Sequence, residues 1–159
     1  MCGIVAVTGY KKALPLLING LEKLEYRGYD SAGIAIINSE TNFISCSKAE
    51  GKLKNLISNL NDHNIPGTVG IGHTRWATHG KPEVKNAHPH TDNSGNIAVV
   101  QNGIIENFQD LKNKLEEEGI IFNSLVFLLL FYKRYNYFRN LLLQYQRNHN
   151  LYIQVFLNH

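Results

Sequence analysis

A cysteine stands at position 2, directly ahead of the small-residue and β-branched run from Gly3 to Val7. Once Met1 is removed, this residue carries both a thiol and a free α-amino group. An α-amine titrates at about 7.7 to 8.0 and a thiol at about 8.5, so each can pass a proton to the other near neutral pH. Cys2 is therefore a candidate nucleophile with its own base. The alternative is a small apolar residue that opens a buried strand.

Two polar segments flanked by glycine carry arginines. The segment 24–33 places Arg27 in a loop that enters a strand, where a fixed cation would favour a thiolate; the alternative is a plain helix end and turn. The segment 72–80 contains Arg75, Trp76, Thr78 and His79. A guanidinium offers paired donors to a carboxylate, and the threonine and histidine side chains add further donors. This second segment is suited to binding a small amino acid.

The pair Asn102-Gly103 follows an apolar run and is typical of a hairpin turn. The same pair can supply a side-chain amide and a backbone N–H to a developing oxyanion. Four nearby histidines suggest a zinc site: His73, His79, His88 and His90. They lack the partner cysteines or the His-Glu-x-x-His helix that zinc sites use. We therefore expect neither a metal nor any other cofactor.

Helices and strands are predicted in mixed order. Leucine and isoleucine at three- and four-residue steps predict helices over 14–24 and 53–60, and a third helix is expected between Asn107 and Gly119. Short β-branched runs predict strands at 4–7, 34–37, 43–46, 68–71 and 97–100. This mixture predicts an α+β fold in which helices cover sheets.

The first 124 residues are nearly neutral, with twelve basic and thirteen acidic side chains, whereas residues 125–159 hold four basic and no acidic ones. The net charge of +3 thus comes from one end, which does not favour nucleic-acid binding. We also recognise no signal peptide and no membrane span, because the apolar run 125–132 meets Lys133-Arg134. A cytoplasmic protein with reduced Cys2 and Cys46 is expected.

Composition changes abruptly at residue 125. Residues 125–159 contain no Gly, Pro, Asp or Ser, yet they hold nine of the sixteen aromatic side chains. We expect this tail to be helical or disordered and not to join the fold. The favoured explanation is translation of a shifted reading frame in AT-rich DNA, and the alternative is an evolved basic helix that binds a membrane or a partner.

Five motifs together carry a resemblance to a known family. Cys2-Gly3-Ile4-Val5, LEYRGYDSAG, GHTRWATHG, NAHPH and QNGIIEN, in this order and spacing, resemble the glutaminase domain of glutamine–fructose-6-phosphate aminotransferases, which are class II glutamine amidotransferases. The resemblance covers residues 2–124 and implies a four-layer αββα N-terminal nucleophile hydrolase fold. The purine-pathway phosphoribosylpyrophosphate amidotransferases resemble the chain less, because they differ at GHTRWATHG.

The resemblance also implies roles in the hydrolysis of L-glutamine. Cys2 attacks the side-chain amide, and Asn102 with Gly103 holds the oxyanion. Arg75 binds the substrate α-carboxylate, and the supporting residues are Trp76, Thr78, His79, Arg27 and His88.

The chain departs from the family pattern after residue 124. The family continues with Glu-Thr-Asp-Thr-Glu, whose Asp holds the substrate ammonium, whereas Leu125 to Leu128 stand here. The family's sugar-phosphate isomerase unit is not recognised. Three interpretations remain open: a truncated enzyme domain inactive in synthesis, a non-catalytic glutamine-binding or regulatory module, and a pseudogene product.

Overall fold

The computed structural model describes residues 2–60, 65–77, 80–92, 95–103, 108–117, 119 and 152–157. The chain divides into two compact units, one made of Met1–Gly103 with Leu151–His159 and the other of Ile104–Asn150. The second unit contains the helix α3 (Phe108–Glu117), which begins where the sequence predicts. All other described helices and strands belong to the first unit.

Two amphipathic helices, α1 (Ala13–Leu24) and α2 (Leu53–Leu60), form one layer of the first unit. In α1, Leu17 and Leu21 are fully buried, since a four-residue step places them on one face. No side chain of a described residue caps the start of α1 with a hydrogen bond, and the N–H of Ala13 instead donates to the carbonyl oxygen of Gly67 at 2.8 Å. Packing on the sheet is therefore the main support of this helix.

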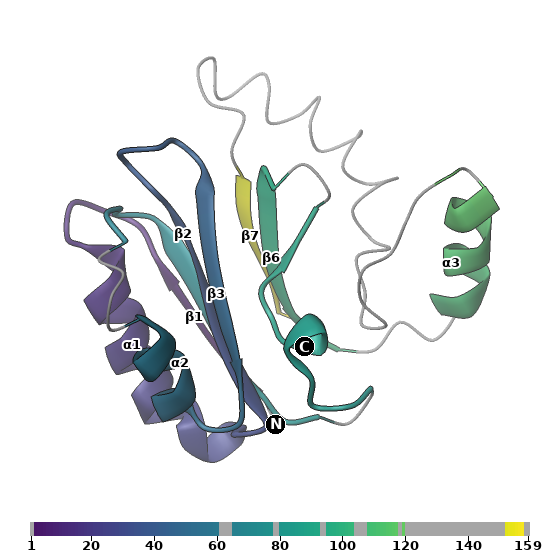
Figure 1. Cartoon of the computed structure of the whole chain (residues 1–159), viewed down its shortest axis with the longest axis horizontal. Coiled ribbons are helices and arrows are strands. Elements are labelled where there is room, and N and C mark those ends of the chain that lie inside the picture. The colour runs from purple at the N-terminus through teal and green to yellow at the C-terminus, as the bar shows by residue number, and fades with distance from the viewer. Residues whose placement is uncertain are drawn as a thin grey trace. The chain divides into compact units, whose positions relative to one another are not determined.

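The first sheet has four antiparallel strands in the order β1-β4-β2-β3 (Figure 1). Their bounds are β1 (Gly3–Val7), β2 (Ser31–Ile37), β3 (Ile44–Glu50) and β4 (Gly70–Arg75). The centre of the sheet is formed by β4 and β2, and every residue of β4 is buried. The polar His73-Thr74-Arg75 run therefore lies inside the molecule.

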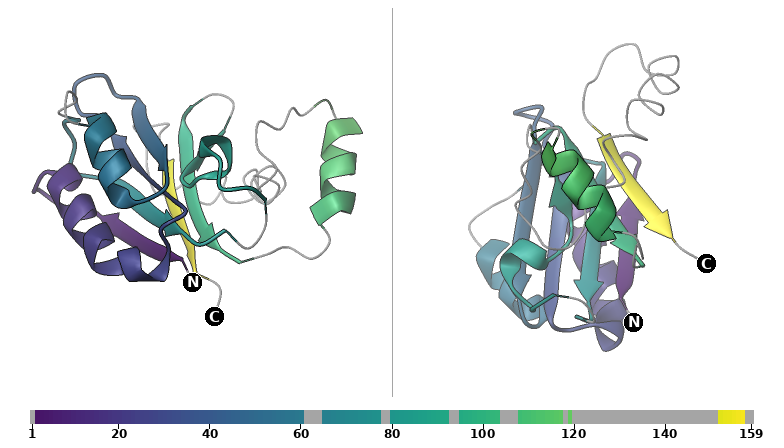
Figure 2. Two further views of the ribbon diagram at one scale, coloured as in Figure 1. Left: turned by 60° about the horizontal axis from the view of Figure 1, so that its bottom comes forward. Right: turned by 90° about the vertical axis from the view of Figure 1, so that its right-hand side faces the viewer.

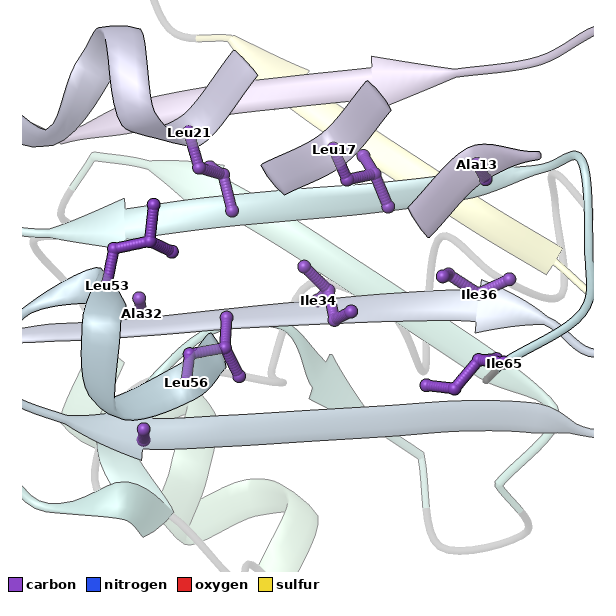
Figure 3. Packing of buried hydrophobic residues seen from close by; sticks show 10 residues of the cluster. Ala13, Leu17, Leu21, Ala32, Ile34, Ile36, Leu53, Leu56 and Ile65 are labelled. Atoms are coloured by element: carbon purple, nitrogen blue, oxygen red, sulfur yellow. The ribbon is translucent and has the colours of Figure 1, made fainter. Parts of the chain in front are cut away.

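One face of this sheet packs against α1 and α2 (Figure 3). The strand β2 contributes Ala32, Ile34 and Ile36 to this face, alternating with residues that point the other way. The helices and the segment before β4 supply the rest of the cluster, including Ala13, Leu17, Leu21, Leu53, Leu56 and Ile65. This cluster is the larger core of the first unit.

The opposite face of the first sheet packs against a second sheet. Ala35 and Ile71 of the first sheet form a smaller apolar cluster with Ala98 and Val100 of the second. Strand alternation places Ile71, His73 and Arg75 on this same face of β4. Polar side chains of the central strand therefore point into the space between the sheets, beside a small apolar cluster.

The second sheet has the order β5-β6-β7. Its strands are β5 (His90–Thr91), β6 (Ile97–Asn102) and β7 (Tyr152–Leu157). The pairing of β5 with β6 is antiparallel, whereas that of β6 with β7 is parallel. Two further views show α1 and α2 on one side of the first sheet and β6 with β7 on the other (Figure 2).

For residues 152–157 alone, the strand β7 corrects the expectation that the tail stays outside the fold and is helical or disordered. Its register runs from Ile97 opposite Tyr152 to Asn102 opposite Leu157. The segment Tyr152–Leu157 contains no Gly or Pro and is rich in β-branched and aromatic residues, so it fits a strand. The expected helix within 125–147 lies outside the described residues.

The other predicted elements are confirmed, with shifted ends. The sequence predicts a strand over 68–71, whereas β4 runs over Gly70–Arg75. The prediction relied on apolar residues, and it therefore stopped before the polar residues 73–75, which are buried in the strand. The α+β fold class is confirmed by the two sheets and by the helices α1 and α2, which cover one face of the first sheet. Among the described residues no helix is long and apolar enough to cross a membrane.

Candidate active site

Cys2 lies at the start of β1, beside the end of β4. Gly3 pairs with Thr74, so Cys2 comes next to Arg75 and Trp76. The backbone N–H of Trp76 donates to Cys2 Sγ at 3.3 Å, and Sγ lies 3.7 Å from the carbonyl oxygen of Trp76. A backbone N–H donor therefore points at the sulfur atom of the candidate nucleophile.

Asn102 reaches the same place from the second sheet. Its Nδ2 donates to the carbonyl oxygen of Cys2 at 3.3 Å, and its Oδ1 lies 2.9 Å from Nε2 of His73. Gly103 follows with a φ of +145°, a backbone conformation that residues other than glycine rarely adopt. An amide side chain and a glycine backbone thus end β6 beside the candidate nucleophile.

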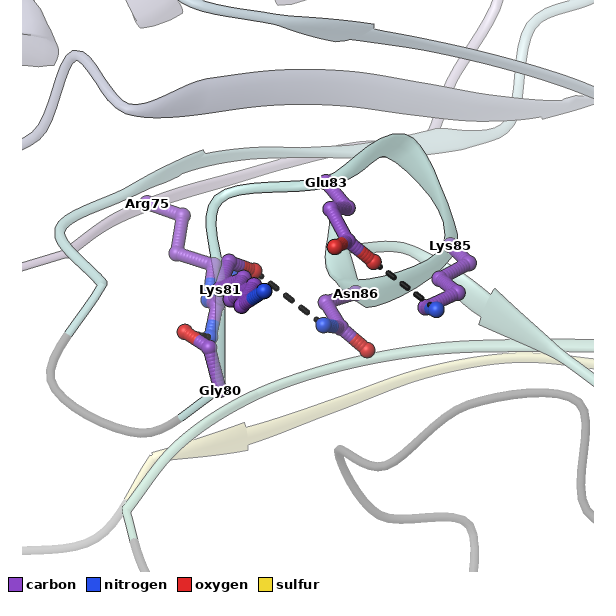
Figure 4. Close-up of polar contacts among 6 residues, drawn as sticks. All are labelled: Arg75, Gly80, Lys81, Glu83, Lys85 and Asn86. Atoms are coloured by element: carbon purple, nitrogen blue, oxygen red, sulfur yellow. Dashed lines mark hydrogen bonds and ion pairs between the residues drawn. The ribbon is translucent and has the colours of Figure 1, made fainter.

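Arg75 is nearly buried, with 4% of its surface exposed. Its Nη1 donates to the carbonyl oxygen of Lys81 at 3.3 Å and its Nη2 to that of Gly80 at 3.4 Å (Figure 4). Burial lowers the pKa of Arg75, whereas Cys2 and Asp30 raise it. The guanidinium charge is therefore coupled to the Cys2 thiol.

Hydrogen bonds hold the segment that contacts Arg75. Asn86, at the end of the short helix η2 (Val84–Asn86), donates its Nδ2 to the carbonyl oxygen of Lys81 at 3.1 Å. Glu83 and Lys85 form an ion pair of 2.8 Å, and Figure 4 shows it beside Asn86. Both groups of that pair are largely exposed, so it adds little stability.

Asp30 supports the same loop from the other side. Its Oδ2 accepts a hydrogen bond from the N–H of Ala77 at 2.8 Å, and its own N–H donates to the carbonyl oxygen of Arg75 at 3.0 Å. The neighbouring Tyr29 packs edge-on against Trp76, with ring centroids 5.3 Å apart. The loop before β2 therefore fixes the chain on both sides of Trp76.

Three buried imidazoles form a column between the sheets. The ring of His88 lies 4.4 Å from that of His73 and 4.4 Å from that of His90, centroid to centroid. Burial lowers the pKa of His73 to about 4 and that of His90 to about 3. Burial, followed by the charges of His73 and His90, also lowers the pKa of His88. All three rings are neutral at pH 7.

Gly33 makes room for this column. A Cβ at Gly33 would stand 2.2 Å from the carbonyl oxygen of His88 and 3.0 Å from Cγ of Lys48. Lys48 lies opposite Gly33 on β3 and donates to the carbonyl oxygen of Ala87 at 3.1 Å. Burial lowers the pKa of Lys48, an effect that Cys46 opposes. The NAHPH segment thus packs directly on the backbone of β2.

The residues proposed from the sequence fall into three groups. Cys2, Asn102, Arg75 and Trp76 meet at one end of the two sheets, with Gly103 next in the chain. Arg27 instead donates to Tyr26 Oη at 3.0 Å, and no hydrogen bond or ion pair between described residues joins it to Cys2. Thr78 and His79 lie outside the described residues. In the part described, no cluster of side chains suits a metal ion.

Sequence reasoning missed the parts played by Asp30 and His73. Asp30 stands inside a recognised motif, but its hydrogen bond to Ala77 depends on a loop contact with no local pattern. The sequence presents His73 as a donor of the 72–80 segment and as a candidate zinc ligand, but not as the partner of Asn102. A two-residue step links His73 to Arg75 on β4, and that alternation is the signal that would have placed both on one face.

Comparison with curated proteins identifies relatives of this chain. It is 58% identical over 125 residues to glutamine–fructose-6-phosphate aminotransferase [isomerizing] of Gloeobacter violaceus, and 56% identical over 124 residues to that of Clostridium perfringens. The chain is a homologue of these aminotransferases. The match covers 78% of this chain but only 20% of each relative, so the chain spans about a fifth of their length. No family model matches the chain.

Solved structures of the amidotransferase class share the fold. The glutamine phosphoribosylpyrophosphate amidotransferase of B. subtilis has a TM-score of 0.66 at 28% identity, over 79% of this chain and 27% of its own. The chain therefore has the fold of the N-terminal nucleophile amidotransferases, as the motifs predict. The higher identity to the fructose-6-phosphate aminotransferases also agrees with the order of the two resemblances.

Proposed function

We propose that this chain hydrolyses L-glutamine to glutamate and ammonia, with Cys2 as the nucleophile. The observation that best supports the proposal is the pair of N–H donors at Cys2. The backbone of Trp76 donates to Sγ, and the side chain of Asn102 donates to the carbonyl oxygen of the same residue. Donors that stabilise both a thiolate and a nearby oxyanion are what acyl transfer requires.

The reaction has two balanced steps. The α-amine of Cys2 takes the proton of its own thiol, Sγ attacks the side-chain amide carbon, and the carbonyl oxygen takes up negative charge beside the Asn102 amide and the Gly103 N–H. When the carbon–nitrogen bond breaks, the α-ammonium of Cys2 returns the thiol proton to the departing ammonia. Water then cleaves the thioester, which gives glutamate and restores the thiol.

Substrate binding follows from the charge at the end of β4. Arg75 would hold the α-carboxylate of glutamine, and Trp76, Thr78 and His79 would line the site. Arg27 and His88 would support it from the loop before β2 and from the imidazole column. The Asp that holds the substrate ammonium in the family has no counterpart at 125–128. A hydrogen bond to a charged group contributes about 1.5 to 3 kcal/mol, so glutamine should bind more weakly here by roughly 10- to 150-fold.

The missing Asp also favours a second candidate function. A chain that keeps Arg75 and the loop around it but lacks the ammonium partner would act as a glutamine-binding or regulatory module with little turnover. In either case fructose 6-phosphate is proposed only as the acceptor of the longer relatives, because this chain spans about a fifth of their length. We expect no glucosamine 6-phosphate from the chain alone.

The test measures ammonia released from L-glutamine by the purified chain and by Cys2→Ala. Mass spectrometry first establishes whether Met1 has been removed, because the α-amine is the proposed proton carrier. Loss of ammonia release in Cys2→Ala supports the proposal, and an equal rate in both proteins contradicts it. Labelling with 6-diazo-5-oxo-L-norleucine separates the two functions: alkylation of Cys2 without turnover of glutamine favours the binding module.

A further inference from the structure

His73 is the described side chain that contacts Asn102 from the first sheet. It lies on β4 with 1% of its surface exposed, and its Nε2 is 2.9 Å from Asn102 Oδ1. The other end of the Asn102 amide, Nδ2, faces the carbonyl oxygen of Cys2 at 3.3 Å. The amide thus stands between an imidazole and the residue proposed as the nucleophile.

The chemistry of these groups fixes the proton on His73. The carbonyl oxygen of Cys2 only accepts hydrogen bonds, so it faces the Nδ2 end of the Asn102 amide. Oδ1, which also only accepts, then faces His73, so Nε2 of His73 carries the proton. In the other tautomer Nε2 would accept, and the Asn102 amide would turn over to donate to it. Oδ1 would then face the carbonyl oxygen of Cys2, and two acceptors would meet at the nucleophile. The tautomer of His73 therefore decides which end of Asn102 faces Cys2.

The surroundings keep His73 in the neutral, Nε2-protonated form. Burial lowers its pKa to about 4, the hydrogen bond with Asn102 raises it, and Arg75 lowers it further. The ring of His88 covers His73, and His90 and Lys48 lie around the same column. Nδ1 of His73 has no hydrogen-bond partner among the described residues, which leaves the contact with Asn102 as the side-chain hydrogen bond of the ring.

We propose that His73 is a positioning residue that turns the amide N–H of Asn102 toward Cys2. The inference deepens the proposed glutamine hydrolysis and rests on it, because the oriented N–H is the donor assigned to the oxyanion. His73 does not itself touch the substrate. It acts through Asn102, so its effect should vanish when Asn102 is absent.

The first test reads the tautomer directly and needs no activity. Nitrogen–proton correlation spectra of the ¹⁵N-histidine-labelled chain should show one ring protonated at Nε2 and unchanged from pH 8 to pH 5.5. His73→Gln assigns that signal by removing it. If the signal assigned to His73 came from a ring protonated at Nδ1, or from a ring that titrates near pH 6.5, the proposal would be overturned even in a chain that hydrolyses no glutamine.

The second test is a double-mutant cycle on ammonia release. His73→Phe keeps a buried ring but removes the donor, and it should lower kcat by about 100-fold with little change in KM, as loss of an oxyanion donor does. Asn102→Ala should lower kcat as much, and the double variant should be no slower than Asn102→Ala. His73→Gln, whose amide N–H can donate to Asn102, should recover part of the rate.

His90→Phe is the matched control, because it changes a ring of the same column that contacts His88 and, among the described residues, forms no hydrogen bond with Asn102. Alkylation of Cys2 by iodoacetamide, which forms no oxyanion, should proceed at the same rate in all these variants. Additive losses in the cycle, or equal losses in His73→Phe and His90→Phe, would show that His73 acts only on stability. Failure of wild-type hydrolysis would refute the proposed function, and the tautomer would then decide this inference alone.

Discussion

At the scale of single residues, Arg75 is the arginine whose charge interacts with Cys2. Its guanidinium is coupled to Cys2 and Asp30, whereas that of Arg27 lies 5.4 Å from the centre of the Tyr26 ring. The sequence gives both arginines similar glycine-flanked surroundings. Strand register separates them, because pairing of Gly3 with Thr74 carries Arg75 to the start of β1.

This difference between the arginines is testable without glutamine turnover. Arg75→Gln removes a positive charge beside the thiol and should slow alkylation of Cys2 by iodoacetamide at pH 7 by roughly tenfold. Arg27→Gln should change that rate less. Cys46 of the same chain, a free cysteine whose thiol pKa is raised by burial, is the internal control, and peptide mass spectrometry follows the two sites separately. A larger effect of Arg27→Gln would return the supporting role to Arg27.

At the scale of elements, the backbone of β2 packs closely against the NAHPH segment at Gly33. Gly33→Ala should destabilise the fold by about 1 to 3 kcal/mol, since its Cβ would overlap the carbonyl oxygen of His88. Urea unfolding followed by circular dichroism measures the change. Ala35→Gly, on the same face of the same strand, is the comparison for loss of a single methyl group. If Gly33→Ala and the wild type had the same free energy of unfolding, the backbone at His88 could move away from the added methyl group without destabilising the fold.

The imidazole column makes stability depend on pH. In the folded chain the pKa of His73 is about 4 and that of His90 about 3, whereas an unfolded histidine titrates near 6.5. The unfolded state therefore binds more protons below pH 6.5. Stability is complete above that pH and falls as the pH drops toward 4, by up to ~1.4 kcal/mol per pH unit for each such ring.

The urea midpoint should thus decrease steadily between pH 7 and pH 5. His90→Phe removes one titrating ring of the column, so its midpoint should depend less steeply on pH over the same interval. A wild-type midpoint that stays constant from pH 7 to pH 5 would contradict the burial of neutral imidazoles. Measurements above pH 5 keep the carboxylates largely ionised and isolate the histidines.

The elements themselves follow well from the sequence, and the site follows in part. Leu17 and Leu21 lie on one helical face, as their spacing predicts, and Cys2 opens a strand. The sequence leaves two interpretations of Asn102, a hairpin turn and an oxyanion donor. The hydrogen bonds of Asn102 with Cys2 and His73 favour the second. Those contacts join residues far apart in the chain, so no local pattern encodes them. The ring contacts of His88 with His73 and His90 were not predicted for the same reason.

At the scale of the whole molecule, the tail takes part in the second sheet. The segment Tyr152–Leu157 covers one edge of β6, and an uncovered edge of an apolar strand invites pairing between molecules. Its sequence carries no family motif, so composition alone could not predict the partner strand. Parallel pairing with β6 needs only an apolar, β-prone segment and a connection long enough to return.

Removal of residues 151–159 should therefore lower the thermal midpoint and increase aggregation. Light scattering and calorimetry on the 1–150 and 1–159 chains make the comparison. Val155→Pro is a point variant for the same pairing, opposite Val100, because proline cannot donate to a ladder. If the shortened chain melts at the same temperature and remains as monodisperse, β7 contributes nothing and the earlier expectation for the tail would stand.

The strand β1 lies at the edge of the first sheet, so we expect activity to be lost at a lower temperature than the fold. Among the described strands β1 pairs with β4 alone, while the central strands are held on both sides. Local opening of an edge strand costs less than global unfolding. Heat inactivation should consequently precede the calorimetric transition, and amide hydrogens of β1 should exchange with solvent faster than those of β2. The circular dichroism spectrum would then still be that of a folded chain when Cys2, the proposed nucleophile, has already left its position.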